Sequence, residues 1–386
     1  MASGLALLFA ATAHAAASYS ITDLGRYDGR AHNYGVALNN AGVVVGYGAD
    51  GIGAFGSTDS RPFQWHGGVL TGITVPGGGY GYASNVGGGG HVVGWYATGS
   101  TPSQRAFAWQ GGTFTALSSL GGDRAAAKDT TGAGDAIVGW SDTAAGGRRA
   151  TLWRNGTIMD LGSLSGWHDS VANAMNDGGG TIVGQVNRYQ LDGSRPGVAV
   201  IWRNGLLQPM SNADPQGYGS YAADVNESGQ VVGTRASSVG GEYDTAFVWH
   251  NGAVTLLGNL PRGISSTAHA LNHAGVVVGT ATVPFGQSFT YHAFVWNGVG
   301  GGGISDLNSL VPHDSGWTLV VASDINSAGQ IVGWGVRDGQ RHGFLLTPVP
   351  EPSALLALSV LGAAVSRRRR SHSDAPARAA VRLVRP

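Results

Sequence analysis

Residue types that could support nucleophilic catalysis meet at residues 166–170, which read Gly-Trp-His-Asp-Ser. A Ser–His–Asp triad requires a hydroxyl, an imidazole and a carboxylate in hydrogen-bond contact. Neighbouring positions along one chain do not provide that geometry, and the sequence has no Gly-x-Ser-x-Gly motif. We therefore assign no catalytic residue.

Motifs for metal and cofactor binding are not found either. A calcium site needs several converging oxygen atoms, yet there is no Asp-x-Asp-x-Asp loop. There is also no His-Glu-x-x-His motif, no phosphate-binding glycine loop and no cysteine. Acidic residues in the expected loops and turns are interpreted as solvated side chains: Asp177, Asp192, Glu227, Glu242, Asp244 and Asp338. We expect neither a metal nor a cofactor.

Five tryptophans are the candidate binding residues. Trp95, Trp140 and Trp334 follow a strand-ending glycine, whereas Trp167 and Trp317 fall in expected loops. An indole ring exposed beside a loop offers an apolar face on which a sugar ring can stack. The alternative is that these rings pack beneath the loops, and the sequence pattern leaves both possibilities open.

The elements that must position these side chains come from one repeated unit. Its clearest copy, residues 268–298, combines an Asn-x-x-Gly turn, a Val-Val-Gly strand, a loose loop, Ala-Phe-Val-Trp and Asn-Gly. The strand-ending glycine recurs roughly every 45–50 residues, at Gly46, Gly94, Gly139, Gly184, Gly233, Gly279 and Gly333. A tryptophan recurs in phase with it, at Trp65, Trp109, Trp153, Trp202, Trp249 and Trp296. We expect the rings of this second series to lie in the core.

Two turn signals divide each unit into two hairpins. Asn-x-x-Gly suits a type I turn followed by a left-handed glycine, and Asn-Gly or Gly-Gly after the tryptophan suits a type I′ turn. The unit is therefore four strands, which we call A, B, C and D in chain order. Strands B and C are apolar at consecutive positions, which indicates that both sheet faces are covered.

These features predict an all-β fold, a seven-bladed β-propeller of four-stranded antiparallel blades. The segment 19–25 matches a D strand, while the last unit ends after its C strand at residues 344–346. The N-terminal strand is thus expected to close the ring in the last blade. A β-solenoid is the alternative fold.

The connections of such a blade fall on two opposite rims. The tight A–B and C–D turns share one rim, which we call the turn rim. The longer B–C and D–A loops share the other, the loop rim. Because binding residues concentrate on loops held by a rigid scaffold, we expect any site on the loop rim.

The repeat resembles the HAF repeat, an extracellular repeat named after its His-Ala-Phe motif. His292-Ala293-Phe294 carries that motif, and the resemblance covers residues 19–346. It implies a secreted protein and leaves the activity open. Residues 16–348 contain 16 basic and 21 acidic residues, and this mildly acidic balance argues against nucleic-acid binding.

Both ends of the chain carry export features. Residues 1–15 contain an apolar run and an Ala-His-Ala site, as in a signal peptide. The propeller spans residues 19–348. Residues 349–370 resemble the PEP-CTERM sorting signal of Gram-negative bacteria, with a Pro-Glu-Pro motif, a short apolar helix and a basic cluster; these residues are Pro350, Glu351, Pro352, Arg367, Arg368, Arg369 and Arg370. Residues 371–386 are expected to be a disordered tail.

This second resemblance implies an exosortase-type membrane protease as partner and a transient membrane-associated form. The apolar run, residues 353–366, is shorter than the roughly 20 residues of a stable membrane span. We expect an exported protein at the cell surface or in the extracellular matrix, without enzymatic activity and associated with exopolysaccharide. A propeller enzyme acting on glycans, either a lyase or a glycosidase, is the alternative.

Overall fold

Each repeat folds into two successive hairpins because the expected turn residues adopt positive φ. The Asn-x-x-Gly turns place their glycine in the left-handed region, with φ of 76° at Gly42 and 79° at Gly275. The Asn-Gly turns have positive φ at both positions, 52° and 72° at Asn155 and Gly156. The computed structural model describes residues 19–51, 59–98, 103–188, 197–236, 243–298 and 302–350.

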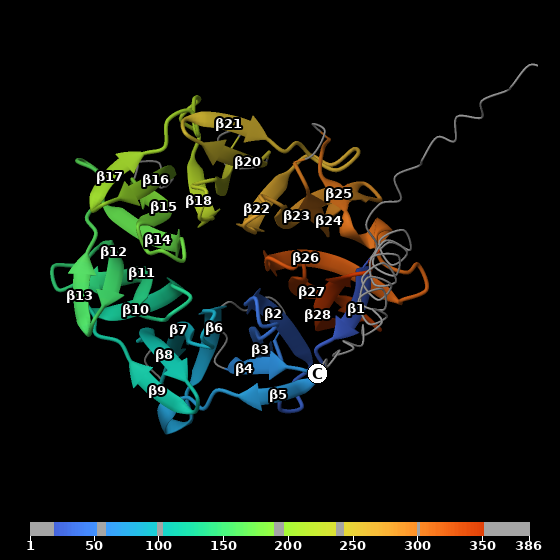
Figure 1. Cartoon of the computed structure of the whole chain (residues 1–386), viewed down its shortest axis with the longest axis horizontal. Helices are drawn as coiled ribbons and strands as arrows, with labels where there is room; N and C mark the ends of the chain where they lie inside the picture. The colour runs from blue at the N-terminus through green and yellow to red at the C-terminus, as the bar shows by residue number, and fades with distance from the viewer. Residues whose placement is uncertain are drawn as a thin grey trace, which may run out of the picture. The chain divides into compact units, whose positions relative to one another are not determined.

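Seven four-stranded antiparallel sheets result, arranged around a common axis (Figure 1). The innermost A strands are β2 (His32–Leu38), β6 (Tyr80–Val86), β10 (Gly121–Thr130), β14 (Asp169–Met175), β18 (Ser220–Val225), β22 (Ser266–Leu271) and β26 (Trp317–Ile325). The B strands are β3 (Val44–Ala49), β7 (Val92–Ala97), β11 (Ala136–Thr143), β15 (Thr181–Asn187), β19 (Val231–Arg235), β23 (Val277–Phe285) and β27 (Ile331–Arg337). The predicted seven-bladed propeller is confirmed.

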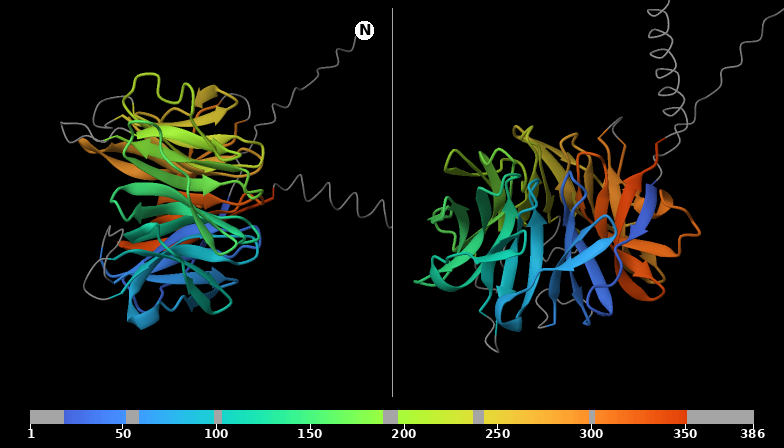
Figure 2. Two further views of the ribbon diagram at one scale, coloured as in Figure 1. Left: turned by 90° about the vertical axis from the view of Figure 1, so that its left-hand side faces the viewer. Right: turned by 60° about the horizontal axis from the view of Figure 1, so that its bottom comes forward.

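The outer half of each blade holds strands C and D. The C strands are β4 (Arg61–His66), β8 (Arg105–Gln110), β12 (Arg148–Arg154), β16 (Gly197–Arg203), β20 (Thr245–His250), β24 (Ser288–Trp296) and β28 (Gln340–Pro348). The D strands are β5 (Val69–Gly72), β9 (Thr113–Ala116), β13 (Thr157–Asp160), β17 (Leu206–Pro209), β21 (Ala253–Leu256), β25 (Ser305–Asp306) and β1 (Tyr19–Asp23). Within the described residues, the 3₁₀ turns η1 (Pro76–Gly78) and η3 (Leu307–Ser309) lie in connections. Figure 2 shows the connections gathered on opposite sides of the ring.

The first strand completes the last blade, as predicted. The seventh sheet has the order β1-β28-β27-β26, so the two ends of the propeller meet in one blade. The backbone N–H of Leu24 donates to the carbonyl of Gly343 at 3.0 Å. The Asp23 carboxylate accepts from Arg337 at 3.2 Å and from His342 at 3.0 Å. Blade 7 therefore has four strands in the same arrangement as the other six blades.

The recurring glycine of strand B is required by a close approach of strand A. A Cβ atom on Gly46 would lie 2.0 Å from the carbonyl oxygen of Tyr34, which no side chain can occupy. In the other six blades, a Cβ atom on the equivalent glycine would lie 1.9 to 2.2 Å from the equivalent carbonyl oxygen of strand A. The approach coincides with a β-bulge in every A strand, where one extra residue interrupts the register. The repeat pattern alone does not indicate this bulge.

Hydrophobic clusters fill the space between neighbouring blades. One joins Val183 and Ile201 of blade 4 to Phe247 and Trp249 of blade 5. Four of the six C-strand tryptophans are at most 7% exposed, and Trp109 and Trp296 are half-buried against the same kind of cluster. The core assignment of this series is confirmed.

A chain of asparagines links the blades at the turn rim. The side-chain oxygen of each accepts backbone N–H groups of its own Asn-x-x-Gly turn. The side-chain nitrogen donates to the backbone of the next blade: Asn226 to Asn272, Asn272 to Asn326 and Asn326 to Asn39, at 3.1 to 3.2 Å. One residue type therefore forms the turn and joins it to its neighbour.

Apart from Val349 and Pro350, both export signals lie outside the described residues. These include the signal peptide at 1–15, the tail at 371–386 and all of the sorting signal from Glu351 onward. Within the part of the chain that the structure describes, no helix is long and apolar enough to cross a membrane.

Candidate functional site: the central channel

The seven A strands enclose a central cavity of about 1180 Å³. It is lined by A-strand residues, by A–B turns and by a few B- and C-strand side chains. We expected the site on the loop rim, but the cavity follows the A strands from about their middle to the A–B turns. Four regions of its wall differ in chemistry.

The middle layer consists of the bulge residues, all of which line the channel: Val36, Ser84, Lys128, Asn173, Ala223, His269 and Ser323. Three of them bond to the A strand of the next blade. Asn173 donates to the carbonyl of Ala222 at 2.8 Å, and Ser323 donates to that of Gly35 at 3.1 Å. His269 Nδ1 lies 2.9 Å from the carbonyl of Ala322. Burial lowers the pKa of His269, and this hydrogen bond opposes the shift only in part.

One residue further toward the turn rim, Asp129, Asp224 and Asp324 form a layer of carboxylates. Each accepts the N–H of its own next residue and, at 2.7 to 2.9 Å, an N–H of the following blade. Burial is the main cause that raises the pKa of Asp224 to about 6 and of Asp324 to about 7, and it raises that of Asp129 well above its usual value. These carboxylates join the blades and are acidic groups of unusually high pKa.

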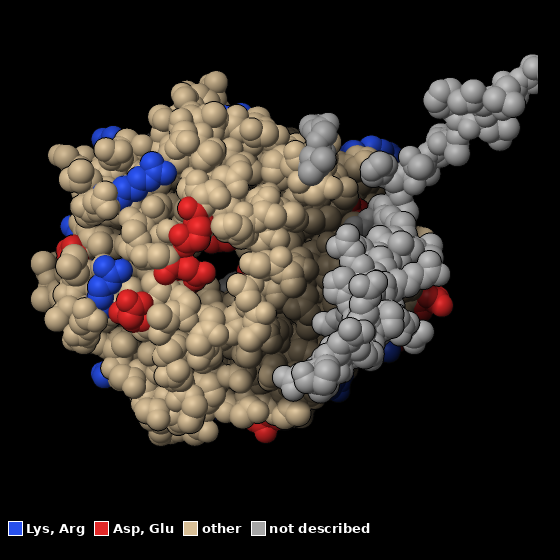
Figure 3. All heavy atoms as spheres, viewed as in Figure 1, with Lys and Arg blue, Asp and Glu red and all other residues tan. Residues whose placement is uncertain are grey.

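The turn-rim end of the channel is also acidic. Asp177 and Glu227, from the A–B turns of blades 4 and 5, line it. Glu227 accepts from Asn176 at 3.0 Å and from the N–H of Gly178 at 2.9 Å. Figure 3 shows acidic atoms beside the central opening, with basic atoms only farther out on that face. A negatively charged ligand would therefore be repelled from this end.

The loop-rim half of the channel carries an arc of aromatic rings across blades 7, 1 and 2. Trp334 meets the edge of Tyr34 at 5.6 Å between centroids, and Tyr34 stacks on Tyr47 at 4.7 Å. Tyr47 lies 4.9 Å from Tyr82, which is parallel to Trp95 at 6.3 Å. We call these five rings the aromatic arc. Trp95 also packs against the cluster that holds Trp140 in blade 3.

Whether a strand-B tryptophan reaches the channel depends on the A-strand residue opposite. Trp140 faces Ala126 and lines the channel, because alanine is too small to cover the indole. Trp334 faces Val321, and both residues line the channel. Trp95 faces Tyr82, whose ring stands between it and the channel. Two of the three candidates after the glycine therefore line the cavity.

Arginine side chains cover the two channel tryptophans. The guanidinium carbon of Arg148 lies 3.7 Å from the centroid of the Trp140 ring, and that of Arg341 lies 4.6 Å from the Trp334 centroid. These distances are those of cation–π contacts. The Trp140 and Trp334 rings thus each support an arginine. The assignment of Trp95, Trp140 and Trp334 as binding residues stays a prediction.

The two tryptophans expected in loops are both half-buried, and the expectation of a loop is wrong for Trp317. Trp167 is half-buried against the cluster between blades 3 and 4, and its backbone N–H donates to the carbonyl of Leu164 at 3.0 Å. Trp317 begins β26 and contacts the edges of His342 and Phe344 at 5.9 and 6.1 Å. Neither lines the channel. Their assignment as binding residues stays a prediction.

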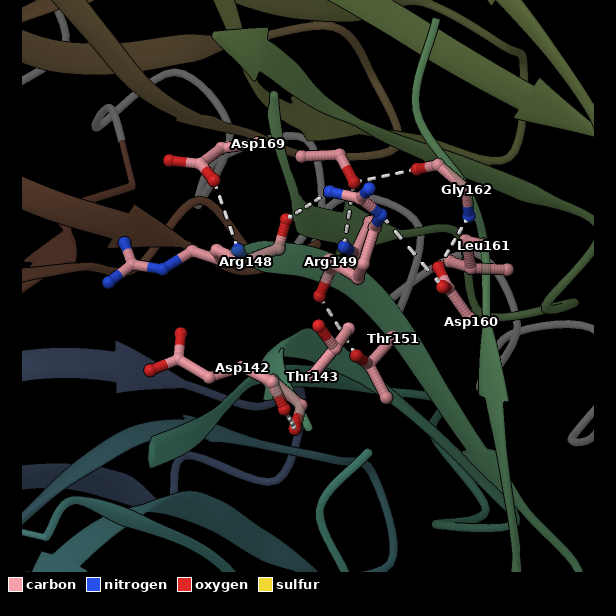
Figure 4. Close-up of polar contacts among 12 residues, drawn as sticks. Asp142, Thr143, Arg148, Arg149, Thr151, Asp160, Leu161, Gly162 and Asp169 are labelled. Atoms are coloured by element: carbon pink, nitrogen blue, oxygen red, sulfur yellow. Dashed lines mark hydrogen bonds and ion pairs between the residues drawn. The ribbon is translucent and has the colours of Figure 1, made fainter. Parts of the chain in front are cut away.

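In the Trp-His-Asp-Ser stretch, the side chains of Asp169 and Ser170 form hydrogen bonds with backbone groups of neighbouring segments. The Ser170 hydroxyl donates to the carbonyl of Gly162 at 2.6 Å and accepts from the N–H of Ala150 at 2.9 Å. Asp169 accepts from the N–H of Arg148 at 3.0 Å (Figure 4). Among the described residues, no group of three or more histidines and carboxylates is placed to hold a metal ion.

Comparisons with known proteins give a fold relationship. A family model described as a protein of unknown function (DUF3466) matches residues 207–343. No curated protein matches the chain. A puromycin-hydrolysing peptidase of Mycobacterium tuberculosis is similar at 12% identity and a TM-score of 0.52, over 83% of this chain and 51% of that one.

TolB from Acinetobacter baumannii is similar at 14% identity and a TM-score of 0.40, over 67% of this chain and 63% of that one. A putative TolB from Agrobacterium tumefaciens is similar at 10% identity and a TM-score of 0.44, over 73% and 94%. The chain thus spans about half of the peptidase and less than two thirds of the first TolB. At these identities the likeness concerns the propeller fold alone.

Proposed function

We propose that this protein is an exported binding propeller of the cell surface or extracellular matrix, without enzymatic activity, that binds exopolysaccharide in its central channel. The observation that carries the proposal is the loop-rim half of the channel. There four rings of the aromatic arc, all except Trp95, and the two arginines that lie over Trp140 and Trp334 line a cavity of about 1180 Å³. Pockets of such size, lined by aromatic rings and a few oriented polar groups, are typical ligand sites.

The chemistry of the wall suits a sugar chain. Tyr82 and Trp334 are half-buried and line the cavity, so part of each ring stays open to a ligand. Hydroxyl groups of a sugar can bond to polar residues in the same space, such as Gln185 and Ser84. The seven blades fix these groups rigidly, which lowers the entropic cost of binding.

Export and processing belong to the same proposal. The sorting motif begins at Pro350, two residues after β28 ends and in an exposed segment. We propose that an exosortase-type membrane protease removes the following segment after transient membrane association. Mass spectrometry of the native surface protein should find no peptide from residues 353–386. Recovery of that segment at full abundance would contradict processing.

The second candidate, a glycan lyase or glycosidase, is favoured by the three channel carboxylates with raised pKa. A glycosidase needs two carboxyl groups that face its substrate. Both oxygens of Asp224 and of Asp324 accept backbone N–H groups, an arrangement that serves blade contacts. Release of reducing ends or of unsaturated sugars from a bound polymer would support the enzyme and reject the non-enzymatic assignment.

A glycan array probed with the full chain tests the binding proposal. We expect binding to extended polysaccharide fragments, with a loss of at least roughly tenfold in Tyr82→Ala. Phe289→Ala is the matched control, because that ring is 40% exposed on β24 and does not line the channel. Absence of binding to every glycan, or equal loss in both variants, would reject the channel as a sugar site.

A further inference from the structure

Lys128 is the only lysine of the chain and the bulge residue of blade 3. In β10, Ala127 pairs with Gly139 and Asp129 pairs with Val138, so Lys128 has no residue opposite it in the hairpin. Its side chain lines the central channel and is exposed to the solvent inside it. The extra residue of a bulge points its side chain differently from its neighbours, and here it places one primary amine in the channel.

The Lys128 amine does not hold the blades together. At the equivalent position of blade 4, Asn173 donates to a carbonyl of the next blade at 2.8 Å. Among the described residues, the amine of Lys128 makes no hydrogen bond and no ion pair. The carboxylate of Asp129 accepts instead from Asn85 at 2.7 Å and from the backbone N–H of Met175 at 2.7 Å. The amine is therefore available to a ligand in the channel.

The surroundings of the Lys128 amine favour its neutral form. Burial within the channel lowers the pKa of this amine, and the positive charge of Arg148 lowers it further. The bulge residues of the two flanking blades, Ser84 and Asn173, carry no charge. More of the Lys128 amine is thus unprotonated at neutral pH than for a lysine in water, and only an unprotonated amine is a nucleophile.

We propose that Lys128 is a covalent binding site for aldehydes that enter the channel, and that it holds them as an imine. The cavity of about 1180 Å³ leaves room for a ligand beside the amine. This inference goes beyond the proposed glycan binding, because it depends on a carbonyl group and not on the hydroxyl groups of a sugar chain.

Imine formation at Lys128 needs no further reactant. The amine nitrogen attacks the carbonyl carbon, and a carbon–nitrogen double bond replaces the carbon–oxygen double bond. The carbonyl oxygen leaves as water with the two protons that the nitrogen loses, so nothing is oxidised or reduced. Because solvent reaches the amine, water can reverse the reaction and release the aldehyde.

Reductive trapping of the full chain with glyceraldehyde tests the inference. Sodium cyanoborohydride at neutral pH converts an imine to a stable secondary amine, and tandem mass spectrometry locates this amine in the sequence. We expect the adduct at Lys128 to form at least roughly tenfold faster in the folded chain than in the same chain unfolded in guanidinium chloride. Unfolding transfers the amine to bulk water and so removes the cause of its reactivity.

Moving the lysine out of the channel is the matched control. Ala253 is exposed on the outer strand β21, so Ala253→Lys in the Lys128→Ala background presents the single lysine on the outside of blade 5. We expect the adduct at position 253 to form at least roughly tenfold more slowly than the adduct at Lys128 in the unchanged protein. Lys128→Ala alone should leave only the N-terminal amine to react.

Equal trapping rates at the two positions, or in the folded and the unfolded chain, would show an ordinary surface amine and overturn the inference. An adduct confined to the N-terminal amine would overturn it as well. Each of these results leaves the proposed glycan binding intact, because glyceraldehyde tests only the reactivity of the amine.

Discussion

At the scale of single residues, tryptophan has two roles in this propeller. In strand C it fills the space between blades, and in strand B of blades 3 and 7 it supports an arginine at the channel. The sequence predicts the first role because the C-strand position is apolar in every repeat. It does not separate the second role from simple packing, because that depends on the A-strand residue opposite.

Replacing Trp249 by alanine tests the core role. Trp249 is 6% exposed and its Nε1 donates to the carbonyl of Ser211 at 3.1 Å. We expect the free energy of unfolding to fall by about 3–5 kcal/mol in Trp249→Ala. Trp167→Ala should cost much less, because this ring is only half-buried beneath a loop. Equal shifts in chemical denaturation would contradict the core assignment.

The channel aspartates predict how stability changes with pH. The folded-state pKa of Asp324, about 7, is above the value of about 4 for an unfolded aspartate. Between these two pKa values Asp324 is protonated in the folded state and ionised in the unfolded state. The contribution of this proton to the free energy of unfolding is therefore present at low pH and is lost as pH rises through 7. His269, whose pKa is lowered, has the opposite effect, but its contribution is complete above pH of about 6.5.

We therefore expect the melting temperature to fall between about pH 6.5 and pH 8. Asp324→Asn should flatten this slope, whereas Asp338→Asn, at an exposed turn, should leave it unchanged. Asparagine also loses one acceptor for a backbone N–H, so the slope and not the absolute stability is the measurement. A melting temperature that rises with pH in this window would show that the sign is wrong.

At the scale of elements, the hairpin turns and the bulged A strands determine where side chains point. The turns could be predicted because Asn-Gly and Asn-x-x-Gly act locally. The bulge could not, because its residues range from Val36 to Lys128 and share no type. The register of one hairpin could have been predicted. Asp338-Gly339 forms a two-residue turn with positive φ at both positions. Counting residue pairs outward from this turn places Arg341 opposite Val336, and therefore diagonal to Trp334.

Substitutions of Asn272 can distinguish the contribution of the turn from that of the contact between blades. Its side-chain oxygen accepts the N–H of Val276 at 3.0 Å, and its nitrogen donates to Asn326 at 3.2 Å. Asn272→Asp keeps the acceptor and loses the donor, whereas Asn272→Ala loses both. We expect alanine to lower stability by about 1–3 kcal/mol and aspartate to have a separate, measurable effect. Unchanged melting temperatures in both variants would show that the asparagine chain does not stabilise the contacts between blades.

At the scale of the whole molecule, closure by β1 makes the ring and therefore the channel. The repeat count and the matching N-terminal segment predicted this closure. The chemistry of the channel was not predictable, because its wall is assembled from side chains of all seven blades, at positions far apart in the sequence.

Removing residues 19–25 should open the ring. Blade 7 would lose its outer strand and expose β28 as an unpaired edge, which favours association between chains. We expect a lower melting temperature and soluble oligomers in size-exclusion chromatography. A chain lacking residues 371–386 is the control and should remain unchanged. Monomeric behaviour at full stability without β1 would contradict closure as the stabilising contact.

Obstruction of the channel tests the central claim most directly. Ala223 is a bulge residue of blade 5 whose side chain lines the cavity, whereas Ala253 is exposed on the outer strand β21. In calorimetric titration with the strongest ligand from the glycan array, Ala223→Trp should weaken binding by at least roughly tenfold. Ala253→Trp should bind like the unchanged protein, and both variants should keep their melting temperature. Undiminished binding by folded Ala223→Trp would contradict the account and place the site outside the channel.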